Sequence, residues 1–191
     1  MANRTPSDGS PDPAKAGRAI GASFMSLFGG IWFAVGINAL YPSITGIALV
    51  GAGTSALIAA SIRVYRRNAR AVPAPAPKGD ERRRWRLFQQ INAAQWIAIG
   101  IVAWALNTAG LARWILPAIV GIIGLHFFPL GRLFAYRPHY WSGSALLLLA
   151  SAYPLISPNG SDNGVCALGV GLILWASSVW ALMSRTSSRS A

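Results

Sequence analysis

Long runs without a charged residue alternate with short polar segments along the whole chain. A helix rises 1.5 Å per residue, so about 20 consecutive apolar residues cross a hydrocarbon core of about 30 Å. The uncharged runs cover residues 19–41, 43–62, 87–106, 111–130, 140–156 and 165–183. This pattern predicts an all-α polytopic membrane protein with six transmembrane helices. Short turns after the first, third and fifth runs pair the helices into three helical hairpins.

The polar segments divide the chain into a transmembrane domain, residues 19–184, and two tails. Residues 1–18 are rich in Pro, Gly, Ser and Asp, which predicts a disordered tail, and residues 185–191 form a second tail. Residues 63–86 read as a basic linker that is extended where Pro and Ala alternate. The first apolar run is too long for the h-region of a signal peptide, which spans about 7 to 15 residues.

The distribution of positive charge predicts the orientation of the helices. Of the 17 Lys and Arg residues, all but Arg113 lie in the two tails, the 63–86 linker or the 131–139 loop. Positively charged loops stay on the cytoplasmic side. We therefore expect both termini in the cytoplasm and the protein in a bacterial-type inner membrane.

The amino-acid composition limits the classes of partner that the chain is expected to bind. The chain is 53% hydrophobic and 12% charged, whereas an average soluble domain has about 25% charged residues. The net charge of +12 is spread between apolar runs, so no nucleic-acid partner is expected, and the lipid bilayer is the first partner. Anionic lipid headgroups are candidates to contact the basic side chains that flank Trp85, although topology alone also explains these charges. The side chains are Arg82, Arg83, Arg84 and Arg86.

The apolar runs offer little chemistry for catalysis. All five carboxylates lie outside them, and the single cysteine, Cys166, excludes an intramolecular disulfide. We expect no catalytic residue, metal or cofactor. His126 is the one side chain at depth that titrates near neutral pH, about 10 Å from the cytoplasmic end of its helix. Gln95 lies at a matching depth and Asn92 nearer the cytoplasm, so these three residues predict an inward-facing polar site.

Each of these residues also has a structural interpretation. His126 hydrogen-bonded to Gln95 would act as a clamp between helices. The serines at similar depth would either line a small cavity or bond their own helix backbones; they are Ser26, Ser55, Ser144, Ser177 and Ser178. Pro117 and Pro129 bracket His126 and predict a bend or an unwound turn, with the end of the helix as the simpler explanation for Pro129.

Small residues recur every four positions on the first two helices, which permits close helix contact. The two sets are Ala22, Ser26, Gly30, Ala34 and Asn38 on the first helix, and Ala48, Ala52, Ala56 and Ala60 on the second. These faces predict packing within the first hairpin, with formation of a homodimer as the alternative.

The segment Gly124-Leu125-His126-Phe127-Phe128-Pro129-Leu130 resembles a His-Phe-x-Pro-Leu stretch near a helix end in small multi-pass bacterial membrane proteins of unknown function. The resemblance covers chiefly residues 121–134 and implies no substrate. Two functions remain open: a small solute permease with a polar site around His126, and a non-catalytic envelope interaction or scaffold protein.

Overall fold

The computed structural model describes residues 12–71, 78–157 and 163–184, and these ranges are helical without any strand. The α-helices are α1 (Pro13–Leu40), α2 (Ile44–Asn68), α3 (Lys78–Thr108), α4 (Ile115–Leu133), α5 (Pro138–Ile156) and α6 (Asn163–Met183). Two single 3-10 turns, η1 (Ala69–Ala71) and η2 (Ala112–Trp114), follow α2 and precede α4. The expected all-α class is confirmed.

Most of these helices are long and apolar enough to cross a membrane. Within the described part of the chain, five qualify by length and composition: α1, α2, α3 from Arg82 onward, residues 112–133, and α6. Helix α5 does not reach the same mean hydropathy, because Ser, His, Tyr and Pro interrupt its apolar residues. The chain therefore has the character of an integral membrane protein, and a sixth span at residues 140–156 stays a prediction.

Several helices extend beyond the apolar runs that mark them in the sequence. Helix α1 begins at Pro13, inside the tail predicted for residues 1–18, because Asp12 caps it and accepts a hydrogen bond from the Ala14 N–H at 2.8 Å. Much of the 63–86 linker is also helical, as the end of α2 and the start of α3. The Pro-Ala repeat and the predicted tail 185–191 lie outside the described residues. The end of an apolar run in this sequence therefore does not mark the end of a helix.

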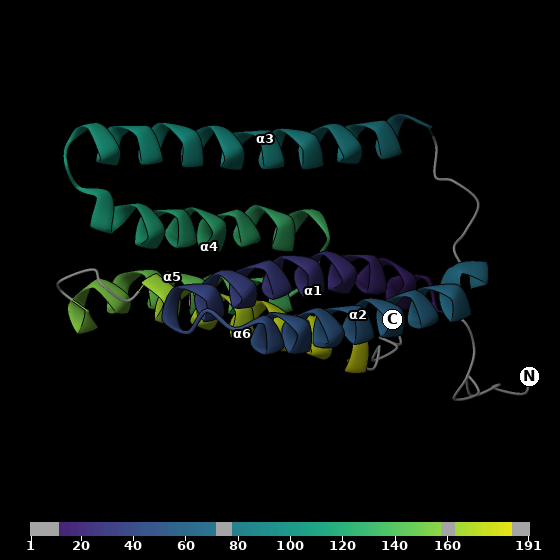
Figure 1. The fold of residues 1–191 in the computed structure, drawn as a ribbon. Coiled ribbons are helices and arrows are strands. Elements are labelled where there is room, and N and C mark those ends of the chain that lie inside the picture. The colour runs from purple at the N-terminus through teal and green to yellow at the C-terminus, as the bar shows by residue number, and fades with distance from the viewer. Residues whose placement is uncertain (1–11, 72–77, 158–162, 185–191) are drawn as a thin grey trace, which may run out of the picture.

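The helices are arranged as two tightly packed pairs with one outer helix on each side. Helix α6 packs against α1, and α5 packs against α4. Helix α2 lies along α1, and α3 lies along the far side of α4 (Figure 1). The first two predicted hairpins, α1 with α2 and α3 with α4, are in contact, whereas α6 packs more extensively against α1 than against its hairpin partner α5.

Small residues at seven-residue intervals hold α1 and α6 together. The facing pairs are Ala22 with Ser178, Gly29 with Gly171, and Gly36 with Gly164. A methyl group on Gly36 would lie 2.8 Å from the Gly164 carbonyl oxygen, so the two backbones are in direct contact there. A seven-residue step keeps one face toward a neighbouring helix, and the opposite direction of the numbering shows that the pair is antiparallel.

The expected packing within the first hairpin is wrong for the exposed members of the two four-residue sets. Gly30 does meet Thr54 of α2, but Asn38 is exposed. On α2, Ala48, Ala52 and Ala56 are exposed as well. Because a helix turns 100° per residue, a four-residue step drifts by about 40° each time, and the set winds away from any single neighbour.

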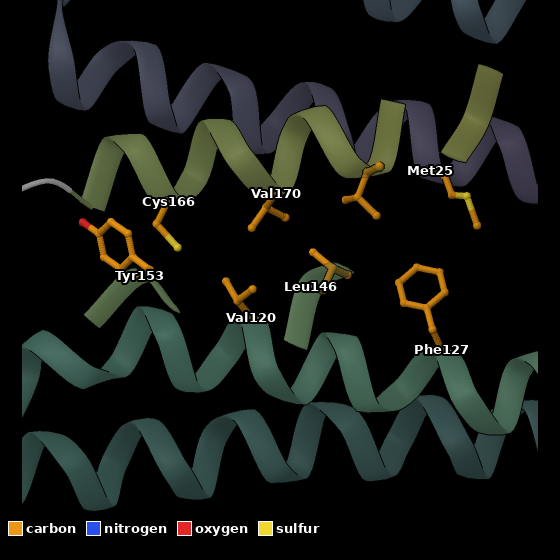
Figure 2. Packing of buried hydrophobic residues seen from close by; sticks show 8 residues of the cluster. Met25, Val120, Phe127, Leu146, Tyr153, Cys166 and Val170 are labelled. Carbon is orange, nitrogen blue, oxygen red and sulfur yellow. The ribbon is translucent and has the colours of Figure 1, made fainter. Parts of the chain in front are cut away.

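Helices α4 and α5 meet through Gly124 and Gly143, where a methyl group on Gly143 would lie 2.7 Å from the Gly124 carbonyl oxygen. Between the two pairs lies an apolar core, in which Figure 2 shows Val120 of α4 and Val170 of α6 directed toward each other beside Leu146 of α5. The other members of this core are Met25, Phe127, Tyr153, Cys166 and Leu174. Pro129 lies inside α4, so the expectation that it ends the helix is wrong.

Candidate functional sites

His126 lies at the contact between α3 and α4. Its imidazole is half-buried, and the backbone of Ile91 on α3 is its hydrogen-bond partner. The Nδ1 atom is buried without a partner among the described residues. The side chain therefore packs in part against protein, as a site at this position requires.

The two amides expected beside His126 behave differently. Asn92 uses its side-chain N–H to bond the Phe88 carbonyl one turn earlier on its own helix, at 2.8 Å. Gln95 is half-buried, and no hydrogen bond links it to His126 within the described residues. The hydrogen-bonded clamp is thus made by a main-chain group of α3 in place of a side-chain amide. A polar site of all three residues stays a prediction.

A second imidazole, which the sequence analysis did not single out, lies close to the first. His139, in the first turn of α5, is 8% exposed and near enough to His126 for charges on the two rings to interact. Its ring packs against Phe127 and Tyr136, with ring centroids 5.5 and 5.0 Å away. The His139 Nδ1 atom is buried and unpaired among the described residues.

Tyr136 connects this region to the start of α1. It lies in the loop between α4 and α5, and its hydroxyl is buried, with the Ser184 side chain as a weak hydrogen-bond partner. Burial raises the pKa of Tyr136 above its usual value, and the nearby Arg18 charge and Ser184 side chain offset part of that rise. Arg18 donates to the Ser184 carbonyl at 3.4 Å, a long contact, and its Nε atom is buried and unpaired.

Arg18, Tyr136, His139 and His126 form what we term the polar cluster. Each of the four carries one buried polar atom that makes no hydrogen bond of good geometry within the described residues. Such atoms are uncommon in folded proteins, and an unseen water, an ion or a functional role usually explains them. The described residues hold no group of three or more His, Cys, Asp and Glu side chains for a metal ion. The polar cluster combines two donors, the Arg18 Nε–H and the Tyr136 hydroxyl, with two imidazole nitrogens.

The serines do not line a shared cavity. Ser26 bonds Ser178 and Ser142 bonds Ser177, each at 2.7 Å between hydroxyl oxygens, so these side chains join α1 to α6 and α5 to α6. The remaining two of the expected serines, Ser55 and Ser144, are exposed.

A shallow apolar groove of about 500 Å³ lies between α3, α4 and α5. It is lined by residues such as Val102, Pro117, Gly121 and Ala150. None of its lining residues is His126, Gln95 or Asn92. The groove therefore occupies the half of α4 that lies before His126 and leaves the predicted polar site outside.

Helix α3 exposes most of its surface. None of the residues in its apolar 18-residue window is buried, compared with 39% of the equivalent window in α6. The arginines near its start are exposed, and Trp85 among them packs against Phe88 with ring centroids 5.6 Å apart; they are Arg82, Arg83, Arg84 and Arg86. One line of exposed residues runs along the helix opposite α4, and we call it the α3 seam. Its members are Gln90, Ala93, Ile97, Gly100, Trp104 and Asn107.

Comparison of the chain with protein-family models, curated proteins and solved structures found no match. The function of the chain is therefore inferred from its own residues and their geometry.

Proposed function

We propose that the chain is a non-catalytic interaction or scaffold protein of a bacterial-type inner membrane, with six spans and both termini in the cytoplasm. The observation that carries this proposal is the exposure of α3. The helix packs mainly against α4, although it is the longest helix of the described ranges. An outer helix with so few protein contacts has a face free for another helix in the bilayer.

The spacing of the α3 seam suits a second helix. Its members follow one another at alternating steps of three and four residues, the pattern of helices that pack knobs into holes. Lipid tails are as apolar as Leu, so apolar residues alone do not drive helix association in a bilayer. Close approach of the two helix backbones does drive association. The space beside Gly100 is open for such an approach, because nothing lies within 4 Å of a methyl group placed there.

The ends of the α3 seam favour a second copy of the chain as the partner. Gln90 and Asn107 place one exposed amide at each end. Two copies inserted in the same orientation and related by a two-fold axis bring each residue of the seam opposite its own counterpart. Each amide then meets an identical amide, which both donates and accepts hydrogen bonds. The homodimer expected from small residues is thus assigned to α3 in place of α1 and α2.

Disulfide cross-linking in native membranes tests this assignment. In a Cys166→Ala background, we expect Ala93→Cys and Ile97→Cys to form dimers under mild oxidation, because both lie on the seam. Ala105→Cys is equally exposed but lies to one side, and Val102→Cys lines the groove toward α4, so both should stay monomeric. Gly100→Leu should reduce cross-linking at Ala93 several-fold without unfolding the chain. Equal cross-linking at Ala105, or none at the seam, would contradict the proposal.

The solute-permease hypothesis rests on a different observation, the unpaired atoms of the polar cluster. A permease needs water to reach His126 and Gln95 from the cytoplasm, and the described groove reaches neither. Labelling of a His126→Cys variant by a membrane-impermeant thiol reagent, applied to the cytoplasmic face, would favour the permease over the scaffold.

A further inference from the structure

The charge of Arg18 has no counter-charge in the described structure. No described carboxylate forms an ion pair with it, and its hydrogen bond runs to a neutral main-chain carbonyl of Ser184. Its Nε atom is buried without a partner. A partly buried guanidinium is costly unless an anion accompanies it, and its planar fork of donors fits carboxylate and phosphate groups.

A second donor lies beside this charge. The Tyr136 hydroxyl is buried, has the Ser184 side chain only as a weak partner, and is close enough to Arg18 for the positive charge to act on it. Behind it, the His139 ring packs edge to face against Tyr136 at an interplanar angle of 82°. His139 is nine-tenths buried, and its free Nδ1 adds a polar atom to a wall that is otherwise aromatic. Aromatic surroundings exclude water and strengthen any charged hydrogen bond formed there.

The position of these donors matches the headgroup layer of a membrane. Arg18 directly precedes the first apolar run, Tyr136 follows the fourth, and Ser184 follows the sixth. The three residues therefore lie where apolar runs begin or end, which is the level at which lipid phosphates are expected. The exposed arginines at the start of α3 offer charge alone, whereas Arg18 and Tyr136 combine charge with a buried hydroxyl.

We propose that Arg18 and Tyr136, backed by His139, bind the phosphate group of an anion at the end of the bundle where α1 begins and α6 ends. The guanidinium pairs with two phosphate oxygens, and the Tyr136 hydroxyl donates to a third. A phospholipid headgroup and a soluble phosphate carry the same chemistry. His126 lies deeper in the bundle and does not contact the phosphate itself. It is near His139, which forms part of the aromatic wall of the site.

Thermal unfolding of the full chain in detergent, followed by tryptophan fluorescence, tests the site. Phosphatidylglycerol added to the micelles should raise the Tm of the native chain by on the order of 5 °C. Diacylglycerol with the same acyl chains should not, because it lacks the phosphate. Inorganic phosphate, compared with chloride at equal ionic strength, forms the second arm. A shift with phosphate alone identifies a soluble anion, and a shift with phosphatidylglycerol alone identifies the lipid.

Variants then assign the shift to residues. Arg18→Gln should lose most of it and Tyr136→Phe part of it, whereas Arg63→Gln, at an exposed position of α2, should keep it. Tyr136→Phe removes only the hydroxyl, so it remains informative if Arg18→Gln does not fold. The proposal is wrong if neither phosphatidylglycerol nor phosphate shifts the Tm, if Tyr136→Phe keeps the full shift, if Arg63→Gln loses as much as Arg18→Gln, or if diacylglycerol reproduces the effect.

Discussion

Ser178 joins α1 to α6 through two hydrogen bonds. Its hydroxyl lies 2.7 Å from that of Ser26 and 3.0 Å from the Ala22 carbonyl oxygen, and the site is fully buried. Hydrogen bonds between membrane helices contribute about 0.6 kcal/mol on average and up to about 1.7 kcal/mol. We expect Ser178→Ala to lower the free energy of unfolding by about 1 kcal/mol, measured by titration with denaturing detergent. Ser144→Ala is the matched control, since Ser144 is exposed on α5; an equal loss there would contradict the interpretation.

Single residues show where prediction from the sequence succeeds and where it stops. The depth of His126 follows from counting along a helix, and the structure does place this side chain against protein. Its partner depends on the rotation of α3 about its own axis, which hydropathy does not determine, and the partner is the Ile91 backbone instead of Gln95. The sequence did not indicate His139, because it lies on a different helix from His126. The spacing of the two residues along the chain matches no helical pattern that would place them together.

At the scale of helix pairs, the contact between α1 and α6 depends on residues without side chains. A methyl group on Gly36 would lie 2.8 Å from the Gly164 oxygen and 2.7 Å from Leu168 Cγ, so the helices would have to separate. We expect Gly36→Ala to cost roughly 1 to 3 kcal/mol, as overpacking does. Gly51→Ala on α2 is the matched control, because nothing lies within 4 Å, and the better helix propensity of Ala should make it neutral or slightly stabilising.

Unfolding of the two glycine variants in detergent would measure the difference. Equal midpoints would show that the α1 and α6 backbones are not in contact.

The pair of α1 and α6 also shows that the sequence predicts the presence of a helix more readily than the partner of that helix. Charge-free runs of sufficient length identify the helices, because the bilayer imposes that length. Pairing depends on which small residues face each other, and the seven-residue set on α1 was hidden behind a four-residue set that shares Ala22 with it.

For the whole molecule, the number of crossings decides where the two ends lie. With six spans both termini are on one side, whereas five spans would place them on opposite sides. Helix α5 is the element in question, since it is the one described α-helix that is not among the candidate membrane spans. It nevertheless lies antiparallel along α4, with Gly131 near His139 at one end and Gly121 near Ala150 toward the other. If α4 spans the membrane, we expect a helix that follows it over this length to cross the same layer as well, with its buried polar residues against protein.

Thiol labelling of intact cells decides between six crossings and five. The native thiol of Cys166 is buried, and Cys166→Ala removes any background. We expect Ala109→Cys, between α3 and α4, and Ser157→Cys, after α5, to react with a membrane-impermeant reagent from outside. Gly79→Cys and Arg137→Cys should react only after the membrane is opened, because positively charged loops stay inside. If Ser157→Cys behaves like Arg137→Cys, α5 does not cross, and the termini lie on opposite sides of the membrane.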